Sequence, residues 1–251
     1  MELLNFFDAN VFIGRHSNPY TPSPFSVENA LEVLQSRQGI TGMLVYHSAA
    51  VAYDPVFGNQ LLIKETREVK ELKRVWVAVP DFAIEKNRLT IWDAEMHEHN
   101  VVAVKIFCHT HNFRIESHSL DVLLEQLEAK SIPLMVDQVE IPWSGLAYIL
   151  NNFPSLPVVL MGVGYRLIRD VDAFLRRFDN LYLEISRYQV HRGIESFCRR
   201  FGSKRLIFGS GLPVFSPEPA MMMVASAAIG REEKMDIAGE NLRRLLHHEK
   251  D

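Results

Sequence analysis

The 251-residue chain has few cysteines, no excess of basic residues and no long apolar run. Cys108 and Cys198 show no zinc-binding spacing, so we expect free, buried thiols in a reducing compartment. Twenty-seven basic residues against 31 acidic ones lack the positive excess that a phosphate backbone requires, which argues against a nucleic-acid partner. No run approaches the roughly 18 apolar residues of a membrane span, and no basic leader opens the chain. We therefore expect a cytoplasmic protein that does not bind membranes.

The composition instead indicates one globular domain. Hydrophobic residues make up 47% of the chain and charged residues 23%, which is enough apolar material for a large core. The length matches the roughly 250 residues of an eight-stranded α/β barrel. Because no linker or low-complexity tract divides the chain, we expect a single domain over residues 1–251.

Short apolar runs alternate with longer amphipathic segments along the whole chain. Almost continuously apolar strands are typical of a parallel sheet that is covered on both faces. The eight runs are Leu3 to Asp8, Gly42 to His47, Val75 to Pro80, Val101 to Phe107, Pro133 to Asp137, Pro157 to Gly162, Leu181 to Ser186 and Arg205 to Ser210. Eight such strands predict an α/β fold closed into a single (β/α)8 TIM barrel.

Three intervening segments carry clear helix patterns. Ser119 is placed to cap a helix with one apolar stripe, formed by Leu120, Leu123, Leu124 and Leu127. A second helix is expected from Ser26 to Arg37, with Gly39 ending it in a left-handed conformation. A third, from Glu232 to His248, is expected to pack as the closing helix. The loop from Arg15 to Phe25 contains three prolines and is a candidate lid.

The ends of the predicted strands carry recognisable motifs. The stretch Arg205-Leu-Ile-Phe-Gly-Ser-Gly-Leu-Pro213 is similar to a Gly-Ser-Asp-x-Pro strand end in which Gly211 replaces the acid. The opening Phe7-Asp-Ala-Asn-Val-Phe-Ile-Gly14 is similar to Asp-x-His-x-His-x-Gly, with Asn10 and Phe12 at the histidine positions. Both motifs resemble those of the amidohydrolase superfamily, in its amidohydrolase-2 branch.

The resemblance extends over the rest of the chain. Ser131-Ile-Pro-Leu-Met-Val-Asp137 resembles the family's fifth strand, with Asp137 in place of a histidine, and Gly162-Val-Gly164 resembles the sixth, with Gly162 in place of another. Asn180-Leu-Tyr-Leu-Glu-Ile-Ser186 resembles the seventh strand, and Gly239 to Leu246 resembles the closing helix. The resemblance therefore spans nearly all of the chain.

Such a resemblance implies a hydrolase or a decarboxylase-like lyase that normally uses zinc or manganese. The five implied metal or catalytic positions are here Asn10, Phe12, Asp137, Gly162 and Gly211. Of these, Asp137 alone has an ionisable side chain, whereas metal-assisted hydrolysis needs three or more good ligands. We therefore predict that the usual metal site is lost and that no cofactor is bound.

Other polar residues near the expected barrel mouth suggest a different chemistry. Asp137 is the best candidate for a general acid or base, although it could instead cap a helix or pair with an arginine. His109 and His111 are candidate catalytic groups whose side chains point the same way only if the backbone is extended there; otherwise they diverge and are surface residues. His47 ends the second strand and is a candidate for substrate binding.

Three further residues are candidates for substrate binding, each with a plainer alternative. Asn10 could instead satisfy loop backbone groups. Glu184 alternates with apolar neighbours and faces either the barrel interior or the helices, where a buried ion pair would explain it. Arg187 follows the seventh strand, where barrel enzymes often bind anions.

Three hypotheses from different classes remain open. The first is a metal-independent enzyme that hydrolyses or decarboxylates a small ester, amide or cyclic acid. The second is a catalytically inactive barrel that binds a metabolite or a protein partner. The third is a relocated metal site formed by His47, His109, His111 and Asp137, whose side-chain types suit zinc. Neither the substrate nor a homo-oligomeric state can be predicted from the sequence.

Overall fold

The computed structural model describes residues 4–17, 23–37, 39–80 and 86–246, and it has a barrel of eight parallel strands in sequence order. Each of the eight apolar runs overlaps one of these strands, which confirms the predicted TIM barrel. The strands are β1 (Phe6–Ile13), β2 (Ile40–His47), β3 (Leu72–Ala78), β4 (Val101–Ile106), β5 (Leu134–Asp137), β6 (Val158–Met161), β7 (Leu181–Glu184) and β8 (Leu206–Ile207).

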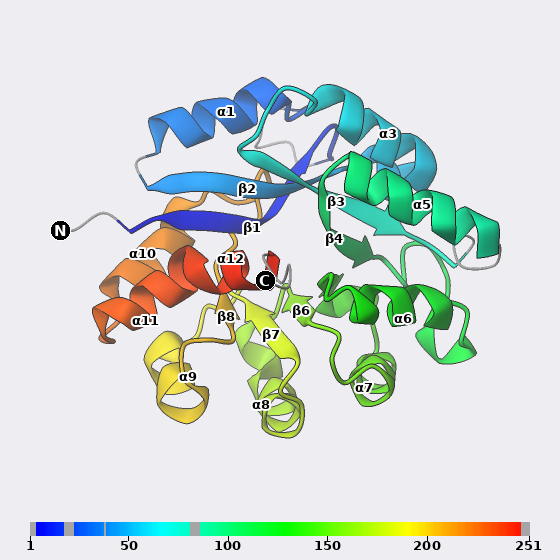
Figure 1. The fold of residues 1–251 in the computed structure, drawn as a ribbon. Helices are drawn as coiled ribbons and strands as arrows, with labels where there is room; N and C mark the ends of the chain where they lie inside the picture. The colour runs from blue at the N-terminus through cyan, green and yellow to red at the C-terminus, as the bar shows by residue number, and fades with distance from the viewer. Residues whose placement is uncertain (1–3, 18–22, 38, 81–85, 247–251) are drawn as a thin grey trace.

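Helices surround the strands (Figure 1). They are α1 (Val27–Ser36), α2 (Ala49–Ala52), α3 (Pro55–Glu65), α5 (Lys86–Glu98), α6 (Asp121–Ala129), α7 (Trp143–Asn152), α8 (Ile168–Arg177), α9 (Gly193–Phe201), α10 (Glu218–Ser226), α11 (Arg231–Met235) and α12 (Asn241–Leu246). Short 3₁₀ turns are η1 (Ile115–Ser117), η2 (Gln138–Glu140) and η3 (Tyr165–Leu167).

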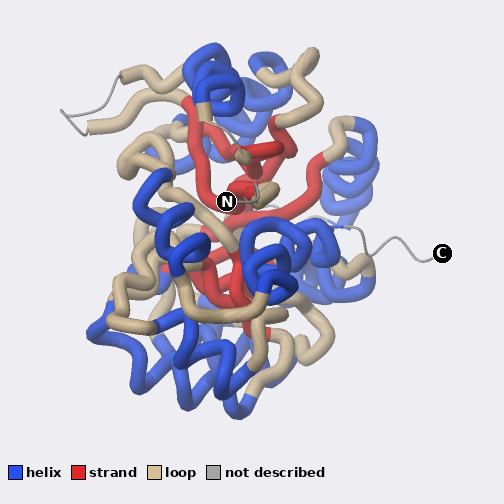
Figure 2. Tube along the Cα trace, turned by 90° about the vertical axis from the view of Figure 1, so that its left-hand side faces the viewer, coloured by secondary structure: helices blue, strands red, loops and turns tan. Residues whose placement is uncertain are grey.

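The barrel closes between its first and last strands through a few backbone bonds. The amide of Ala9 donates to the Phe208 carbonyl (3.0 Å). Further along, Phe12 donates to Leu212 (3.1 Å), and Gly211 donates to Asn10 (3.0 Å). Because β8 has two residues, the segment that follows it completes the seam with β1. Figure 2 shows the strands at the centre of the molecule with helices on either side.

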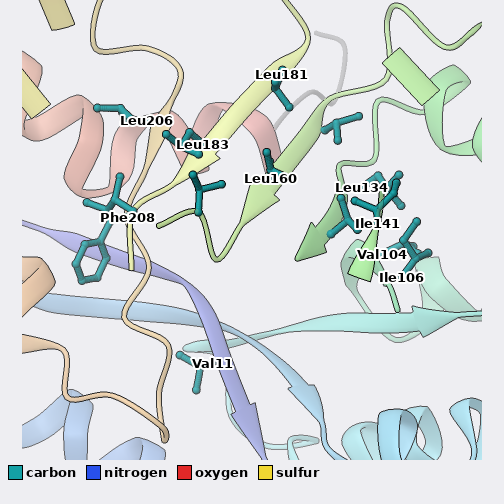
Figure 3. Packing of buried hydrophobic residues seen from close by; sticks show 14 of the residues in the cluster. Val11, Val104, Ile106, Leu134, Ile141, Leu160, Leu181, Leu183, Leu206 and Phe208 are labelled. Carbon is teal, nitrogen blue, oxygen red and sulfur yellow. The ribbon is translucent and has the colours of Figure 1, made fainter. Parts of the chain in front are cut away.

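Apolar side chains form two layers, one inside the barrel and one between the strands and the helices. The outer layer includes Val104 and Ile106 of β4, which Figure 3 shows with residues of neighbouring strands. Ala103 lies in the inner cluster, which Leu242 and Leu245 of α12 also join. Since side chains alternate along a strand, Lys105 has the same inward parity as Ala103.

The first strand is longer than the sequence indicated. It continues past Asp8 to Ile13, with a register shift between Asp8 and Val11, and pairs with β2 as far as His47. Asn10 and Phe12 therefore lie within a strand that borders the barrel mouth. The polar residue Asn10 is accommodated in the strand by this register shift, and no loop begins after Asp8.

The predicted cap at Ser119 is wrong. Helix α6 begins at Asp121, its preceding residue Leu120 makes no side-chain cap bond, and the Ser119 hydroxyl accepts a bond from Ser117 (2.9 Å). The apolar stripe of this helix is nevertheless buried as expected. The helix at Ser26 is confirmed, because Ser26 caps α1 through the Asn29 amide (3.3 Å) and Gly39 has a φ of 102°.

The closing helix packs against β1 and β8 as expected, but it is interrupted. A π-helical turn, η4 (Asp236–Glu240), separates α11 from α12. The Ile237 carbonyl at this turn accepts a bond from the Phe208 amide (3.1 Å), so the helix widens where it meets the end of β8. Residues 247 and 248 of the predicted helix and 18–22 of the candidate lid lie outside the described residues.

The two cysteines are buried and unbridged, as the sequence predicted. Within the part of the chain that the structure describes, no helix combines the length and apolar character that crossing a bilayer requires.

Asn241 anchors the closing helix to β8. Its buried side-chain amide donates to the carbonyls of Ser203 and Leu206, both at 2.8 Å. Replacing Asn241 with leucine removes both bonds, although the Ser203 carbonyl keeps its bond from the Leu206 amide (3.1 Å), so we expect a loss of about 1 to 3 kcal/mol in the free energy of unfolding. Urea denaturation of both proteins measures this change. Asn151→Ala, at an exposed helical asparagine, is the control and should change stability by less than about 0.5 kcal/mol; equal effects would contradict the anchoring role.

Candidate functional site

A buried ion pair lies inside the barrel, near the carboxyl ends of its strands. The Lys105 ammonium on β4 is 2.8 Å from the Asp137 carboxylate, which ends β5. The lysine side chain is 2% exposed and the aspartate side chain 23% exposed. Asp137 is thus the part of the pair that solvent can reach. This confirms that Asp137 is partly buried, and its partner is a lysine where the sequence suggested an arginine or a helix cap.

Aromatic rings surround the ammonium. Lys105 Nζ lies 4.6 Å from the ring centroid of Tyr46 and 5.1 Å from that of Phe107, and both contacts are of the cation–π type. Phe12 extends this wall, with its ring centroid 5.6 Å from that of Tyr46. The ammonium is therefore held by one carboxylate and the faces of two rings.

The charges around Lys105 determine its protonation. Burial alone would lower its pKa, but the opposing effects of Asp137, Tyr46 and Glu184 are larger and raise the pKa above its ordinary value. Lys105 is consequently a cation at any physiological pH, which excludes the neutral amine that Schiff-base chemistry needs.

A second polar group lies at the end of β7. Ser186 donates both its amide (2.5 Å) and its hydroxyl (2.8 Å) to the Glu184 carboxylate, and the Asn10 side-chain amide donates to the same group (3.3 Å). Glu184 is fully buried, and burial raises its pKa to about 7 despite the bonds from Ser186. The negative charges of Asp8 and Asp137 add to this increase. Glu184 faces the interior, but its described bonds are hydrogen bonds and not the buried ion pair suggested as an alternative.

Asp8 lies at the seam between the first and last strands. One of its oxygens accepts bonds from the amides of Asn10 (3.0 Å) and Ser210 (2.9 Å), while the other is buried without a partner. Burial raises the pKa of Asp8 to about 6. Its bonds join both sides of the seam, so it helps to close the barrel directly below the mouth.

His47 faces another region. Its Nδ1 accepts a bond from the Ala49 amide (3.0 Å), and its Nε2 is 3.6 Å from the Glu65 carboxylate. Burial lowers its pKa, and Glu65 opposes this effect. The ring borders a cleft of about 680 Å³ between the first two βα units. Among the described residues, His47 makes no bond to Asp137.

The His-x-His pair lies in a turn after β4 and not in extended backbone, so the two rings are not aligned as chelators. His111 Nε2 bonds the Val51 carbonyl (3.1 Å), and His109 is exposed. Both histidines border a cleft of about 1370 Å³ formed by the loops after β3, β4 and β5. Among the described residues, neither histidine makes a bond to Asp137.

Arg187 is exposed and lies over the Phe215 ring, with 5.7 Å between the guanidinium carbon and the ring centroid. The structure thus groups Asp137, Glu184 and Asn10 around the interior charges. It places the histidines and Arg187 on surrounding loops and rims.

The side chains at the positions where the resemblance implies metal ligands do not suit a divalent metal. Asn10 bonds Glu184, Phe12 packs on Tyr46, and Asp137 is already paired with an ammonium. Across residues 4–17, 23–37, 39–80 and 86–246, no group of three or more His, Cys, Asp or Glu side chains could hold an ion. The relocated metal site therefore has no support in the structure.

The two glycines at positions where the resemblance implies metal or catalytic residues have backbone conformations that disfavour any side chain. Gly162 has a φ of 69° and Gly211 a φ of 79°, both in the left-handed region. A Cβ at Gly211 would also lie 2.8 Å from the Phe215 ring. A side chain at either position would therefore be strained.

Lys105 is the main residue that sequence reasoning missed. It is the one charged residue in the run Val101-Val-Ala-Val-Lys-Ile106, where it is the last residue but one. A lone charge of inward parity in an otherwise apolar barrel strand was the available indication. Its partner could not be identified without the three-dimensional arrangement.

Comparison with known proteins supports the fold. No family model matches the sequence, and no curated protein matches it significantly. The chain has the fold of a dihydroxybenzoic acid decarboxylase from Polaromonas, whose structure contains manganese and the inhibitor 2-nitroresorcinol (12% identity, 99% of this chain and 98% of that one, TM-score 0.75). It is also similar to 5-carboxyvanillate decarboxylase from Sphingomonas paucimobilis (13%, 97% and 99%, 0.73) and to an amidohydrolase 2 from Bifidobacterium longum (16%, 97% and 98%, 0.66). The TIM barrel predicted from the sequence is therefore the fold observed, and structures of a decarboxylase and of an amidohydrolase 2 share it.

The two raised carboxyl pKa values predict how stability depends on pH. A folded-state pKa above the unfolded value of roughly 4 means that the folded chain binds more protons between the two values. Stability is then greatest below pH ~4 with respect to Glu184 and Asp8, and it falls as the pH rises through about 6 and about 7. Glu184→Gln should flatten the decline in the free energy of unfolding between pH 5 and 8.

Denaturant titrations across this pH range measure the slope. Glu68→Gln is the control, because the Glu68 side chain is 90% exposed, and it should leave the slope unchanged. A Glu184→Gln slope equal to that of the original chain would show that Glu184 does not change its protonation on folding.

Proposed function

We propose that this chain is an enzyme of the hydrolase or decarboxylase type that acts on a small molecule at the carboxyl ends of the barrel strands without a divalent metal. The observation that carries this proposal is the position of Asp137. It is the solvent-accessible member of an otherwise buried charged group, at the barrel end where enzymes of this fold place their active sites. The fold shared with decarboxylases and an amidohydrolase supports the reaction class.

In this proposal Asp137 accepts or returns a proton at the substrate. Lys105 holds the carboxylate from below, so that its free oxygen is directed by a fixed partner and not by a mobile side chain. A general acid or base held in this way typically contributes 10²- to 10⁴-fold to a rate. Lys105 itself is a positioning residue, because its ammonium is almost fully buried.

The opposite wall supplies polar contacts for the substrate. Asn10 and Ser186 are partly exposed, and Glu184 lies behind them and bonds both. We propose that these groups bind a polar part of the substrate. His109 and His111 would contact a more distant part through the larger cleft, whereas His47 borders the smaller cleft and Arg187 lies on the loop after β7.

A binding protein without turnover is the second candidate, and one observation favours it. Phe12, Tyr46 and Phe107 place aromatic rings beside the Lys105–Asp137 pair, while the clefts of about 1370 Å³ and about 680 Å³ lie among the flanking loops. In that case a ligand should raise the melting temperature without being consumed.

Asp137→Asn tests the catalytic proposal. A screen of small esters, amides, cyclic acids and aromatic acids, run with a chelator present, should reveal a turnover that this substitution lowers by about 10² to 10⁴-fold in kcat. The amide keeps the shape of the side chain but cannot take up a proton. Steady-state kinetics by product chromatography measure the loss.

Asp93→Asn is the matched control, since Asp93 also pairs with a lysine, Lys130, but on the outer helices. It should leave kcat unchanged. If no substrate is turned over in chelator, or if the Asp137→Asn enzyme retains full kcat, the catalytic proposal fails. Ligand-induced stabilisation without consumption would then favour the binding protein.

A further inference from the structure

The interior of this barrel contains a concentration of negative groups. Asp8 and Glu184 are fully buried, and Asp137 is partly buried. The charges of Asp8 and Asp137 both raise the pKa of Glu184, which places the three carboxyl groups within electrostatic reach of one another. A group of this kind requires a nearby cation, because uncompensated charge in a low-dielectric interior is costly.

We infer that the Lys105 ammonium is a built-in substitute for the divalent cation of similarly folded metalloenzymes, and that its removal leaves a cradle that binds a small exogenous cation. The cradle consists of the Asp137 carboxylate and the ring faces of Tyr46 and Phe107. This inference concerns charge and stability and does not depend on catalytic turnover.

The geometry of the three contacts supports this role. The carboxylate is 2.8 Å from the nitrogen, and the two ring centroids lie at 4.6 Å and 5.1 Å. Carboxylates and aromatic faces are the groups with which proteins recognise ammonium ions. A metal at the same place would find the Asp137 carboxylate and the Tyr46 hydroxyl, because Phe107 offers no lone pair, and this is fewer than the three or more ligands that a divalent ion needs. The surroundings of Nζ thus suit an organic cation and not a metal.

The position of Lys105 in its strand also supports its role as a substitute cation. The rest of β4 is apolar, and Ala103, two residues earlier, lies in the apolar inner cluster. If Lys105 only filled volume, an uncharged residue would avoid the cost of burying an ammonium. A charge at this position is explained by the carboxylates that it faces.

Lys105→Ala supplies the direct test. The substitution removes a propylammonium fragment, so n-propylammonium should restore the missing atoms and raise the melting temperature of the variant by several degrees. The original chain should show no such rise. 1-Propanol is the neutral control of nearly the same shape and should stabilise the variant much less. An equal response to n-propylammonium and 1-propanol, or an equal response of the variant and the original chain, would overturn the inference.

A second pair of variants keeps the test decisive if Lys105→Ala does not fold. Lys105→Met retains most of the side-chain volume and removes the charge, and Lys105→Met/Asp137→Asn removes both charges. We expect the double variant to melt at a higher temperature than the single one, because the carboxylate no longer lacks its cation. Lys130→Met with Asp93→Asn, at the more exposed pair, should show little coupling. A double variant no more stable than Lys105→Met would contradict the role of the ammonium as a counter-charge.

Adding metal ions tests the alternative that Asp137 binds a metal. Mn²⁺ or Zn²⁺ should not raise the melting temperature of the original chain through Asp137. A metal-dependent rise that Asp137→Asn abolishes would show that this carboxylate binds a metal, and it would overturn the inference even if the catalytic proposal held. Loss of turnover in chelator tests the catalytic proposal separately.

Discussion

The ion pair between Lys105 and Asp137 determines how charge is arranged inside this barrel. An ammonium loses strong hydration when it enters an interior, so its burial is favourable only where opposite charge and polarisable groups surround it. Here one carboxylate and two ring faces do so, and the lysine remains charged although it is almost inaccessible. The same cation also stabilises the negative form of nearby carboxyl groups, whose burial acts in the opposite direction. At the mouth of the barrel, the cost of burying the carboxylates is therefore offset in part by the positive charge of Lys105.

The backbone supports this arrangement. At the ends of β6 and β8, Gly162 and Gly211 occupy left-handed conformations, and Phe215 fills the space beside Gly211. A side chain at either position would be strained. Gly209, two residues after the end of β8, has a related role, since a Cβ there would lie 2.3 Å from the Glu184 carboxylate on β7. Glycines on two segments, after β6 and after β8, thus leave room for the side chains of Asp137, Phe215 and Glu184. The residue types at these motif positions are consequently linked by packing with one another's neighbours in a single site.

Much of the fold could be predicted from the sequence, because a parallel barrel strand needs apolar residues on both faces and therefore forms a visible run. The end of β1 could not, since the bulge after Asp8 keeps polar residues in the strand through pairing with β2. The π-helical turn at Ile237 was equally hidden, because it depends on a tertiary bond to Phe208. In the site, Asp137 could be located from its motif, whereas Lys105 could not be assigned a role. The chemistry of a buried lysine depends on what it faces, and that information lies in strands distant in sequence.

The barrel separates into two ends, and this explains how chains that share only 12% to 16% identity can have the same fold. Leu242 and Leu245 of α12 join the inner apolar cluster with Ala103, so much of the packing that closes the barrel depends on apolar pattern alone. Apolar patterns tolerate extensive substitution when volume is retained. The charged groups lie toward the other end of the same strands, where each residue is chosen for its chemistry. An attached ammonium in the role that we infer for Lys105 therefore requires particular residues at the mouth and places no demand on the packing below it.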